Sequence, residues 1–148
     1  MRTYAPFSRH PRRLMPSETP GSPRRDVRTL IVDDCRSFRV VARELLERRG
    51  YTVVGEAETA AGAIEAIERH PPDAVLLDVN LPDTSGAVVA TYLNARYPAI
   101  AVLLVSADKD EDAYPLLEQT GARGFVNKFE LARVNLAWYW PRPPQRGS

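Results

Sequence analysis

Short apolar runs alternate along the chain with longer segments in which apolar residues recur every three to four positions. Each run is rich in Val, Leu, Ile or Ala and is bounded by turn residues, which is typical of strands buried on both faces. The longer segments are typical of helices that bury one side. The expected strands are Arg28–Val32, Tyr51–Gly55, Ala74–Leu77, Ile100–Val105 and Ala122–Val126.

The longer segments predict one helix after each strand. Thr59 is a candidate N-cap for the second helix, and Gly50 and Gly121 are candidate stops for the first and fourth. The expected helices span 38–46, 59–67, 87–97, 110–119 and 131–138, and Pro141 ends the last one. Strands that alternate with helices through short connections require a parallel sheet with helices on both faces and right-handed crossovers. The predicted fold class is therefore α/β.

Charge and proline content separate the two ends of the chain from this pattern. Residues 1–25 hold five prolines and six arginines against one acid, Glu18, although the whole chain of 148 residues has a net charge of only +1. Such a segment buries too little apolar surface to fold, so we expect a disordered basic arm at 1–25. Residues 26–140 form the expected domain, and 141–148 a loose tail. A basic arm can contact DNA or a membrane, but a solvated tail explains the same residues, and we expect neither contact.

Two further features concern the compartment. Cys35 is the only cysteine, which excludes an internal disulfide and fits a reducing environment. No apolar stretch approaches the roughly 18–20 residues of a membrane span. We therefore expect a cytoplasmic protein. Cys35 itself is expected to be a small buried filler rather than a redox residue.

Polar side chains stand at the ends of four of the expected strands. They are Asp33-Asp34, Asp78, Ser106 and Lys128. The carboxyl ends of parallel strands meet at one edge, where three carboxylates would repel one another and raise each other's pKa. A hard divalent cation with oxygen ligands, Mg²⁺ or Mn²⁺, removes this conflict. With a lysine and a hydroxyl beside it, the site can hold a phosphoryl group, and Asp78 is the best-placed nucleophile.

At these residues the chain resembles the receiver domains of two-component response regulators. The matching stretches are LIVDDCRSFRVVARELLE, PDAVLLDVNLPDTSG, VLLVSAD and GARGFVNK, in the family's order, and the similarity covers about residues 26–138. The resemblance implies a flavodoxin-like, doubly wound five-stranded parallel sheet of order 2-1-3-4-5 with five helices. Each motif alone is weak, and the signal lies in their joint register.

The resemblance also implies a role for each polar position. Asp78 would be the phosphoacceptor and also a metal ligand. Asp34 would bind Mg²⁺ directly and Asp33 mainly through water, with the backbone carbonyl of Asn80 completing the protein ligands. Ser106 and Lys128 would sense the phosphoryl group and neutralise its charge, and Phe125 would be the switch aromatic. Polar residues at the positions of Asn80 and Asp108 accompany faster dephosphorylation in the family, so we expect a short-lived phosphoryl state.

The implied function is that of a single-domain response regulator, not an enzyme beyond its own phosphorylation and dephosphorylation. The donor would be a sensor histidine kinase or a histidine phosphotransfer protein. The helix 4–strand 5–helix 5 face would change on phosphorylation and signal to a downstream protein. Because no output domain follows, Tyr139 and Trp140 are candidates for a partner or homodimer surface. Trp138 fits the inner face of the last helix, and packing of the aromatic pair against the chain's own tail is an equal alternative.

Alternative interpretations remain for the single residues and for the whole. Either acid after the first strand could be an N-cap, and Asp78 could be a turn residue. Ser106 could be a cap, Lys128 a solvated charge, and Phe125 plain core packing. The chain could be a pseudo-receiver that binds partners without phosphorylation. An Asp-nucleophile phosphatase is a third reading, but Asn80 stands where such enzymes carry a second acid.

Two departures from the family pattern concern local structure. Phe129 follows Lys128 where the family often has a proline after a cis peptide, and without proline a cis bond would cost about 2.5–4 kcal/mol. Pro115 falls within the fourth helix, where it is tolerated only in the first turn. We therefore expect a helix that begins near Tyr114–Pro115 or is frayed before it.

Overall fold

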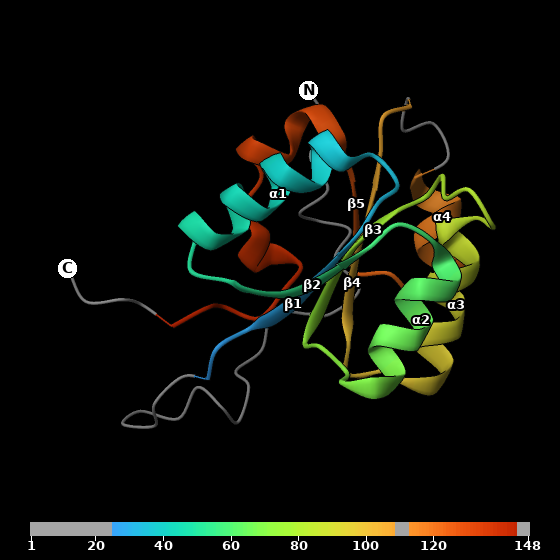
Figure 1. The fold of residues 1–148 in the computed structure, drawn as a ribbon. Coiled ribbons are helices and arrows are strands. Elements are labelled where there is room, and N and C mark those ends of the chain that lie inside the picture. Colours follow the sequence, from blue (N-terminus) through green and yellow to red (C-terminus); the bar gives the residue numbers. More distant parts are fainter. Residues whose placement is uncertain (1–24, 109–112, 145–148) are drawn as a thin grey trace.

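The sheet positions all the polar strand ends on one edge. The structure is a computed structural model, and it describes residues 25–108 and 113–144. Its five strands are all parallel, in the order β2-β1-β3-β4-β5, which confirms the predicted topology. They are β1 Arg28–Val32, β2 Thr52–Ala57, β3 Ala74–Asp78, β4 Ala101–Ser106 and β5 Gly124–Asn127 (Figure 1).

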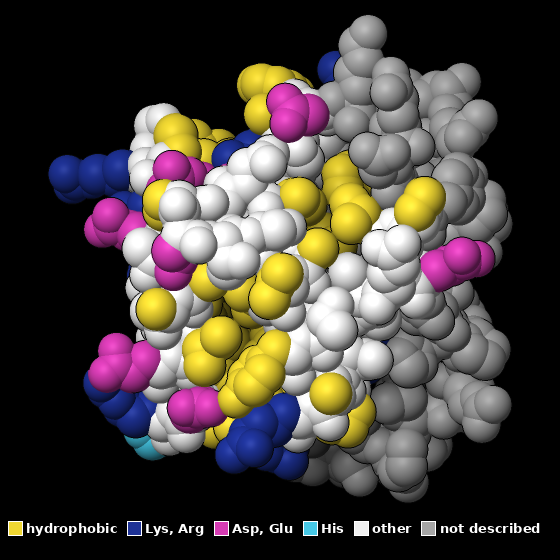
Figure 2. Space-filling view, turned by 90° about the vertical axis from the view of Figure 1, so that its right-hand side faces the viewer, with side chains coloured by type: hydrophobic (Ala, Val, Ile, Leu, Met, Phe, Trp, Pro, Cys, Tyr) yellow, Lys and Arg dark blue, Asp and Glu magenta, His cyan; other side chains and the backbone are white. Residues whose placement is uncertain are grey.

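Helical segments cover both faces of this sheet, as Figure 1 shows. The helix α1 (Arg36–Arg48) lies on one face together with two short 3-10 helices, η3 (Lys128–Arg133) and η4 (Leu136–Trp138). The helices α2 (Ala60–Arg69), α3 (Gly86–Arg96) and α4 (Ala113–Thr120) lie on the other. On that second face, hydrophobic side chains gather in the middle and charged ones at the rim (Figure 2), and α3 exposes Val88 there. None of the described helices is both long and apolar enough to cross a membrane.

The strands β3 and β4 form the centre of the core, since every one of their residues is buried. Their register pairs Asp78 with Val105, so the acid ends its strand one residue before Ser106 ends the next. Uniformly apolar strands of this kind require cover on both faces, which the two helical layers provide. Asp78 and Ser106, which end these two strands, are therefore carried by a fully buried part of the sheet.

The predicted caps agree with the structure. The hydroxyl of Thr59 accepts a hydrogen bond from the backbone N–H of Gly62 at 3.0 Å, which makes it the N-cap of α2. Gly50 follows α1 with φ +94°, a left-handed conformation that glycine adopts without a steric penalty. Pro115 falls in the first turn of α4 as that helix is described, where a missing N–H leaves no hydrogen bond unmade. The rest of the prediction for this helix falls on 109–112, outside the described residues, as do the predictions for 1–24 and 145–148.

The last helical segment differs in kind from the expected α-helix, because it consists of η3 and η4 joined by extended backbone at Val134 (φ −87°, ψ 154°). The guanidinium of Arg49 donates to the backbone oxygens of Ala132 and Val134, the second at 2.8 Å. These bonds anchor the backbone of the segment to the end of α1. A tertiary contact from the end of α1 thus holds the segment where side-chain spacing predicted an α-helix.

This change reverses the expected exposure of the terminal aromatics. Tyr139 and Trp140 are both buried, and Trp140 packs edge-on against Tyr51 with ring centroids 5.3 Å apart. Trp138 is instead 36% exposed. The prediction of Tyr139 and Trp140 as a partner or homodimer surface is wrong, because 3-10 and irregular backbone does not follow the 100° rotation that a regular helix imposes on neighbouring residues. The alternative named the chain's own tail as the packing partner, whereas the partner that the structure shows for Trp140 is Tyr51 of the folded domain.

Candidate functional site

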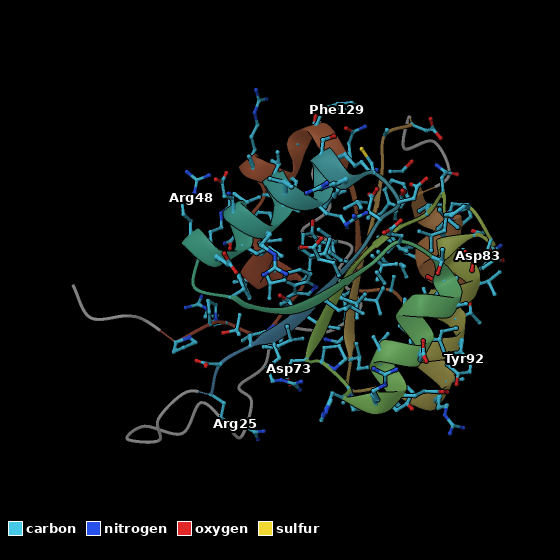
Figure 3. The ribbon with its side chains drawn as sticks, in the orientation of Figure 1. Arg25, Arg48, Asp73, Asp83, Tyr92 and Phe129 are labelled. Carbon is cyan, nitrogen blue, oxygen red and sulfur yellow. The ribbon has the colours of Figure 1, made fainter. Side chains whose placement is uncertain are left out.

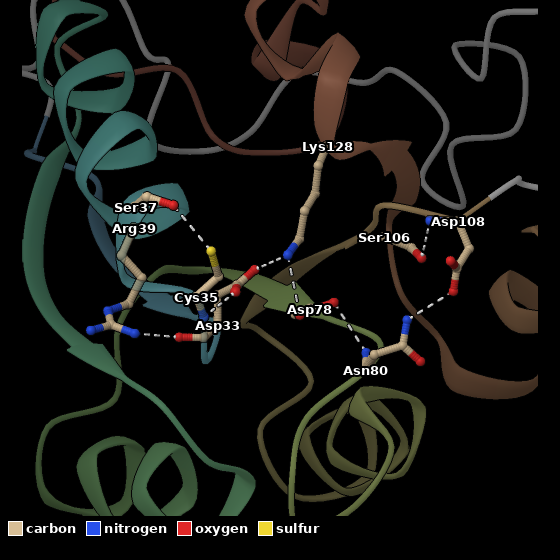
Figure 4. Close-up of polar contacts among 9 residues, drawn as sticks. All are labelled: Asp33, Cys35, Ser37, Arg39, Asp78, Asn80, Ser106, Asp108 and Lys128. Atoms are coloured by element: carbon tan, nitrogen blue, oxygen red, sulfur yellow. Dashed lines mark hydrogen bonds and ion pairs between the residues drawn. The ribbon is translucent and has the colours of Figure 1, made fainter.

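Five polar side chains from four strand ends come together at the carboxyl edge of the sheet, and Figure 4 shows all of them except Asp34. Asp33 and Asp34 follow β1, Asp78 ends β3, Ser106 ends β4 and Lys128 follows β5. Figure 3 shows Phe129, the neighbour of Lys128, on the side where the strands end, and Asp73 at the opposite end of the sheet. The structure therefore places all five predicted positions in one site.

The three acids form a cluster suited to a metal ion. One carboxylate oxygen from each of Asp33, Asp34 and Asp78 lies within 4.8 Å of the others. Asp33 and Asp78 are buried and Asp34 is exposed, so the cluster has a dry base and an open mouth. A hollow of about 430 Å³ borders it, lined by Asp34 and residues 79–85. All-oxygen donors with space for water fit Mg²⁺ or Mn²⁺.

Lys128 joins two of these acids. Its Nζ lies 2.6 Å from Asp33 Oδ2 and 3.3 Å from Asp78 Oδ2, and it also lies 4.7 Å from the centroid of the Phe38 ring. Partial burial alone would lower the pKa of this ammonium, but the bonds and charges of Asp33 and Asp78 outweigh burial and raise it. The lysine is therefore a fixed positive charge between the two buried carboxylates.

The groups around Asp78 shift its pKa in opposite directions. Burial raises the pKa of this carboxyl most strongly, the Asn80 N–H lowers it through a 3.0 Å hydrogen bond to Oδ1, the Asp33 charge raises it, and Lys128 lowers it. The net direction is upward, because desolvation penalises the ionised form. A further cation bound at the cluster would favour the ionised form of Asp78 and so lower its pKa.

The loop after Asp78 approaches the strand very closely. The Gly86 N–H donates to the Val79 carbonyl at 2.6 Å, and Asn80 bridges to Ser85. A Cβ on Gly86 would lie 2.0 Å from the Asp78 carbonyl oxygen, which no side chain can tolerate. Glycine is therefore required where α3 begins, and it lets the loop fold back beside the acid.

Asp108 connects the loops that follow three strands. Its N–H donates to Ser106 Oγ at 3.0 Å, its Oδ2 accepts from Asn80 Nδ2 at 3.2 Å, and its carbonyl accepts from Asn127 Nδ2 at 3.2 Å. The hydroxyl of buried Ser106 is thus held at the site by Asp108. Asn80 and Asp108, which lie 28 residues apart in sequence, are thus direct partners.

The remaining predicted residue of the site is Phe125, which is buried in β5 opposite Leu104. Its ring belongs to the core in this conformation. The peptide after Lys128 is not cis, as none among the described residues is, and the chain enters η3 directly with Phe129 81% exposed. This is the local difference expected where proline is absent.

Cys35 is not the buried filler that was expected, because it is exposed at the start of α1. Its N–H donates to Asp33 Oδ1 at 2.8 Å and its Sγ lies 3.2 Å from Ser37 Oγ. A hydrogen bond from the Ser37 hydroxyl and one from the Phe38 N–H lower the pKa of the thiol. Its contact with the acid cluster is therefore made by the backbone amide and does not depend on the thiol.

Two residues of the site were missed by the sequence pattern. Arg39 is only 8% exposed, and its guanidinium donates to the Asp33 carbonyl at 2.7 Å. It shares the buried stripe of α1 with Ala42 and Leu46, so a charge on an apolar face was the available signal. Asp83 accepts from the N–H groups of Ala60 and Ala61 at 2.9 and 3.0 Å, which ties the loop after β3 to the start of α2.

Comparisons with known proteins agree with this geometry. A profile of the response regulator receiver domain matches residues 29–136. The chain is 41% identical over 104 residues to the transcriptional regulatory protein NarL of Mycobacterium tuberculosis, covering 69% of this chain and 48% of NarL. It is 32% identical over 108 residues to the chemotaxis protein CheY of Bacillus subtilis, covering 72% of this chain and 90% of CheY.

Solved structures show the same similarity. The signal receiver domain of the M. tuberculosis NarL superposes with a TM-score of 0.64 at 39% identity, covering 70% of this chain and 84% of that one. Several of the curated relatives are longer proteins, and this chain spans about half the length of NarL and of a transcriptional regulator from Pseudomonas aeruginosa. The similarity thus concerns one domain.

Proposed function

Because the chain belongs to the response regulator receiver domain family, we propose that it accepts a phosphoryl group on Asp78 from a sensor histidine kinase or a histidine phosphotransfer protein. One observation carries this proposal: a single ammonium, that of Lys128, contacts both Asp33 and Asp78, with Asp34 completing the cluster. A core of structural ion pairs does not need a third, exposed acid. A site that must receive a further cation and a phosphoryl group does.

The metal ligands that we propose are Asp34 and Asp78, the backbone carbonyl of Asn80, and Asp33 through water. Mg²⁺ or Mn²⁺, when bound, would offset the negative charge of the incoming phosphoryl oxygens. The all-oxygen acid cluster and the adjacent hollow support this assignment. The same hollow provides access from solvent to the exposed Asp34.

In the transfer itself, the reacting groups are an oxygen of Asp78 and the phosphohistidine of the donor. The carboxylate oxygen forms a bond to phosphorus while the phosphorus–nitrogen bond of the donor phosphohistidine breaks, and the imidazole nitrogen keeps the electron pair and takes up a proton. The product is an acyl phosphate. Lys128 neutralises charge on the phosphoryl oxygens, and the Ser106 hydroxyl donates to one of them. Water later attacks the phosphorus, which regenerates the carboxylate and releases inorganic phosphate.

The structural response that we propose begins at Ser106. Its hydroxyl would leave Asp108 for the phosphoryl group, and Phe125 would fill the space that Ser106 vacates. The α4–β5 face with the 3-10 segment after it would then change and contact a downstream protein. Binding of a second copy of the chain is a further possible output. We further propose that the chain catalyses its own phosphorylation and dephosphorylation. We also propose that it acts in the cytoplasm.

Asn80 and Asp108 are proposed to shorten the life of the phosphoryl group. Their hydrogen bond places an amide and a carboxylate next to Asp78, where attacking water must pass. Polar groups here can hold that water, whereas apolar ones would exclude it. This assignment supports a signal that decays without a separate phosphatase.

The function is tested by incubating the chain with radiolabelled acetyl phosphate, with and without Mg²⁺. We expect label on the wild type that depends on Mg²⁺ and is absent from Asp78→Asn. Absence of label on a folded, Mg²⁺-binding wild type would favour the pseudo-receiver alternative. Continued release of phosphate from unrelated phosphomonoesters would favour a phosphatase.

A further inference from the structure

Arg39 is the most deeply buried cation near the acid cluster among the described residues, and the transfer described above does not use it. It comes from α1 and contacts Asp33, which directly follows β1 (Figure 4), and Glu56 of the neighbouring strand β2. Its Nε donates to Glu56 Oε1 at 2.9 Å and its Nη1 donates to the Asp33 carbonyl at 2.7 Å. Burying a guanidinium is unfavourable unless it is paired, so its position requires a reason.

The bond to the Asp33 carbonyl fixes more than one atom. A peptide group is planar, so the oxygen of Asp33 and the N–H of Asp34 turn together. Holding that oxygen therefore sets the direction in which the chain presents Asp34, the exposed member of the acid cluster. The Asp33 N–H is meanwhile bound to the Ala57 carbonyl at 3.0 Å, so the peptide before Asp33 is held by β2 and the peptide after it by Arg39 of α1.

The charge of Arg39 and its hydrogen-bond geometry have opposite expected effects on binding of a metal cation. A positive charge behind the acids disfavours a second cation, whereas correct placement of Asp34 favours it. Glu56 lies at 2.9 Å and Glu58 at 4.0 Å from the guanidinium, so these carboxylates largely cancel its charge. The orienting effect should therefore dominate.

We propose that Arg39 is a positioning residue of the phosphoryl site, whose fork between Glu56 and the Asp33 carbonyl presents Asp34 to the divalent cation. This inference rests on the proposed function, since it assigns the acids to a metal. It predicts that loss of the fork weakens Mg²⁺ binding without altering Asp78 itself. It also predicts that loss of the fork moves the amide signal of Asp34 in the metal-free protein.

The chain offers a matched control in Arg43. This residue also donates to Glu56, from Nε to Oε2 at 2.8 Å, but it lies one helical turn further along α1 and its other bond goes to Glu47. Arg39→Met and Arg43→Met each remove one guanidinium from Glu56, and only the first frees the Asp33 carbonyl. Arg39→Lys keeps the charge and loses the fork, because an ammonium is a point donor.

The experiment measures two quantities on each folded variant. The first is the dissociation constant of Mg²⁺ by calorimetry, and the second is the amide ¹H–¹⁵N shift of Asp34 in the metal-free protein. We expect Arg39→Met to weaken Mg²⁺ about tenfold and to move the Asp34 amide, Arg39→Lys to show the same direction, and Arg43→Met to change neither. If Arg39→Met does not fold, Arg39→Lys decides.

Three outcomes would overturn the inference. Equal Mg²⁺ affinity in Arg39→Met and Arg43→Met would show that Arg39 is only structural. Tighter Mg²⁺ binding in Arg39→Met would show that its charge outweighs its geometry. An unmoved Asp34 amide would show that the peptide is held by other groups. A wild type that binds no Mg²⁺ would instead contradict the proposed function, so the two failures are distinct.

Discussion

The side-chain amide of Asn80 donates a hydrogen bond to Asp108 at 3.2 Å, which joins the loop after β3 to the loop after β4 directly beside Asp78. Asp108 in turn holds Ser106 through its N–H and Asn127 through its carbonyl. The acceptor, the hydroxyl and the end of β5 are therefore connected through one exposed carboxylate residue.

The Asn80–Asp108 pair should act as a unit in dephosphorylation. Asn80→Ala and Asp108→Ala should each lengthen the half-life of the phosphorylated chain, because each removes a polar group that can hold the attacking water. The double variant should show less than the sum of the two effects, since residues in direct contact couple by about 0.5–3 kcal/mol. Decay of radiolabelled protein measures this. Unchanged or faster decay in the single variants, or strict additivity, would contradict it.

Lys128→Gln should slow phosphorylation strongly while leaving Mg²⁺ bound. The ammonium stabilises charge in transit, and loss of one such group costs about 10²–10³ in rate. Mg²⁺ affinity should hold or rise, because the cation that competes for Asp33 and Asp78 is gone. Rapid labelling with acetyl phosphate measures the rate. Arg133→Gln is the control, as it removes an exposed cation from the same 3-10 helix; equal rates in the two variants would refute the role.

Asp78→Asn should stabilise the metal-free protein at neutral pH. The pKa of Asp78 is raised from 3.8, first by burial, so the folded state binds this proton more tightly than the unfolded state. The resulting stabilisation is complete below the unfolded pKa and is lost as the pH rises through the raised folded pKa. At neutral pH the ionised carboxylate is thus unfavourable, and the neutral amide avoids this.

Thermal unfolding between about pH 4 and pH 8 tests this prediction. The gain in Tm for Asp78→Asn should be largest at the alkaline end and should shrink toward the acid end and on addition of Mg²⁺ to the wild type. A Tm for Asp78→Asn below that of the wild type at neutral pH would contradict the direction of the pKa shift.

Gly86→Ala should disrupt the site more than a glycine change elsewhere. Its Cβ would overlap the Asp78 carbonyl oxygen at 2.0 Å, so the loop or α3 must move. We expect a loss of stability of about 1–3 kcal/mol, as for other forced overpacking, together with weaker Mg²⁺ binding. Gly55→Ala is the control, since its Cβ would meet only Leu30 Cδ1 at 3.4 Å. Urea unfolding of both variants measures the difference, and equal stabilities would contradict the role of Gly86.

The sequence predicts the sheet and the acid cluster well for a physical reason. Buried parallel strands need continuous apolar runs, and a polar residue that ends such a run can only lie at the carboxyl edge. Asp78 and Lys128 are 50 residues apart in sequence, and topology alone brings them within 3.3 Å. Local pattern and chain topology therefore suffice for this part of the site.

Contacts between distant segments decide what the sequence does not predict. Two 3-10 helices, anchored by bonds from Arg49 to the backbone around Val134, stand where an α-helix is expected, and Tyr139 and Trp140 are buried beside them. Arg39 was missed because its partner at the site is a backbone oxygen, which has no signature in a side-chain pattern. Cys35 was misjudged for the same reason, since its amide and not its thiol contacts Asp33.

The most direct test of the central claim is to locate the phosphoryl group. The chain is treated with acetyl phosphate and Mg²⁺, reduced with borohydride, which converts an aspartyl phosphate into homoserine, and digested for mass spectrometry. We predict homoserine at position 78 and at no other acid, and none when Mg²⁺ is omitted. Homoserine at Asp33 or Asp34, or none at all in protein that binds Mg²⁺, would contradict the assignment of Asp78 as the phosphoacceptor.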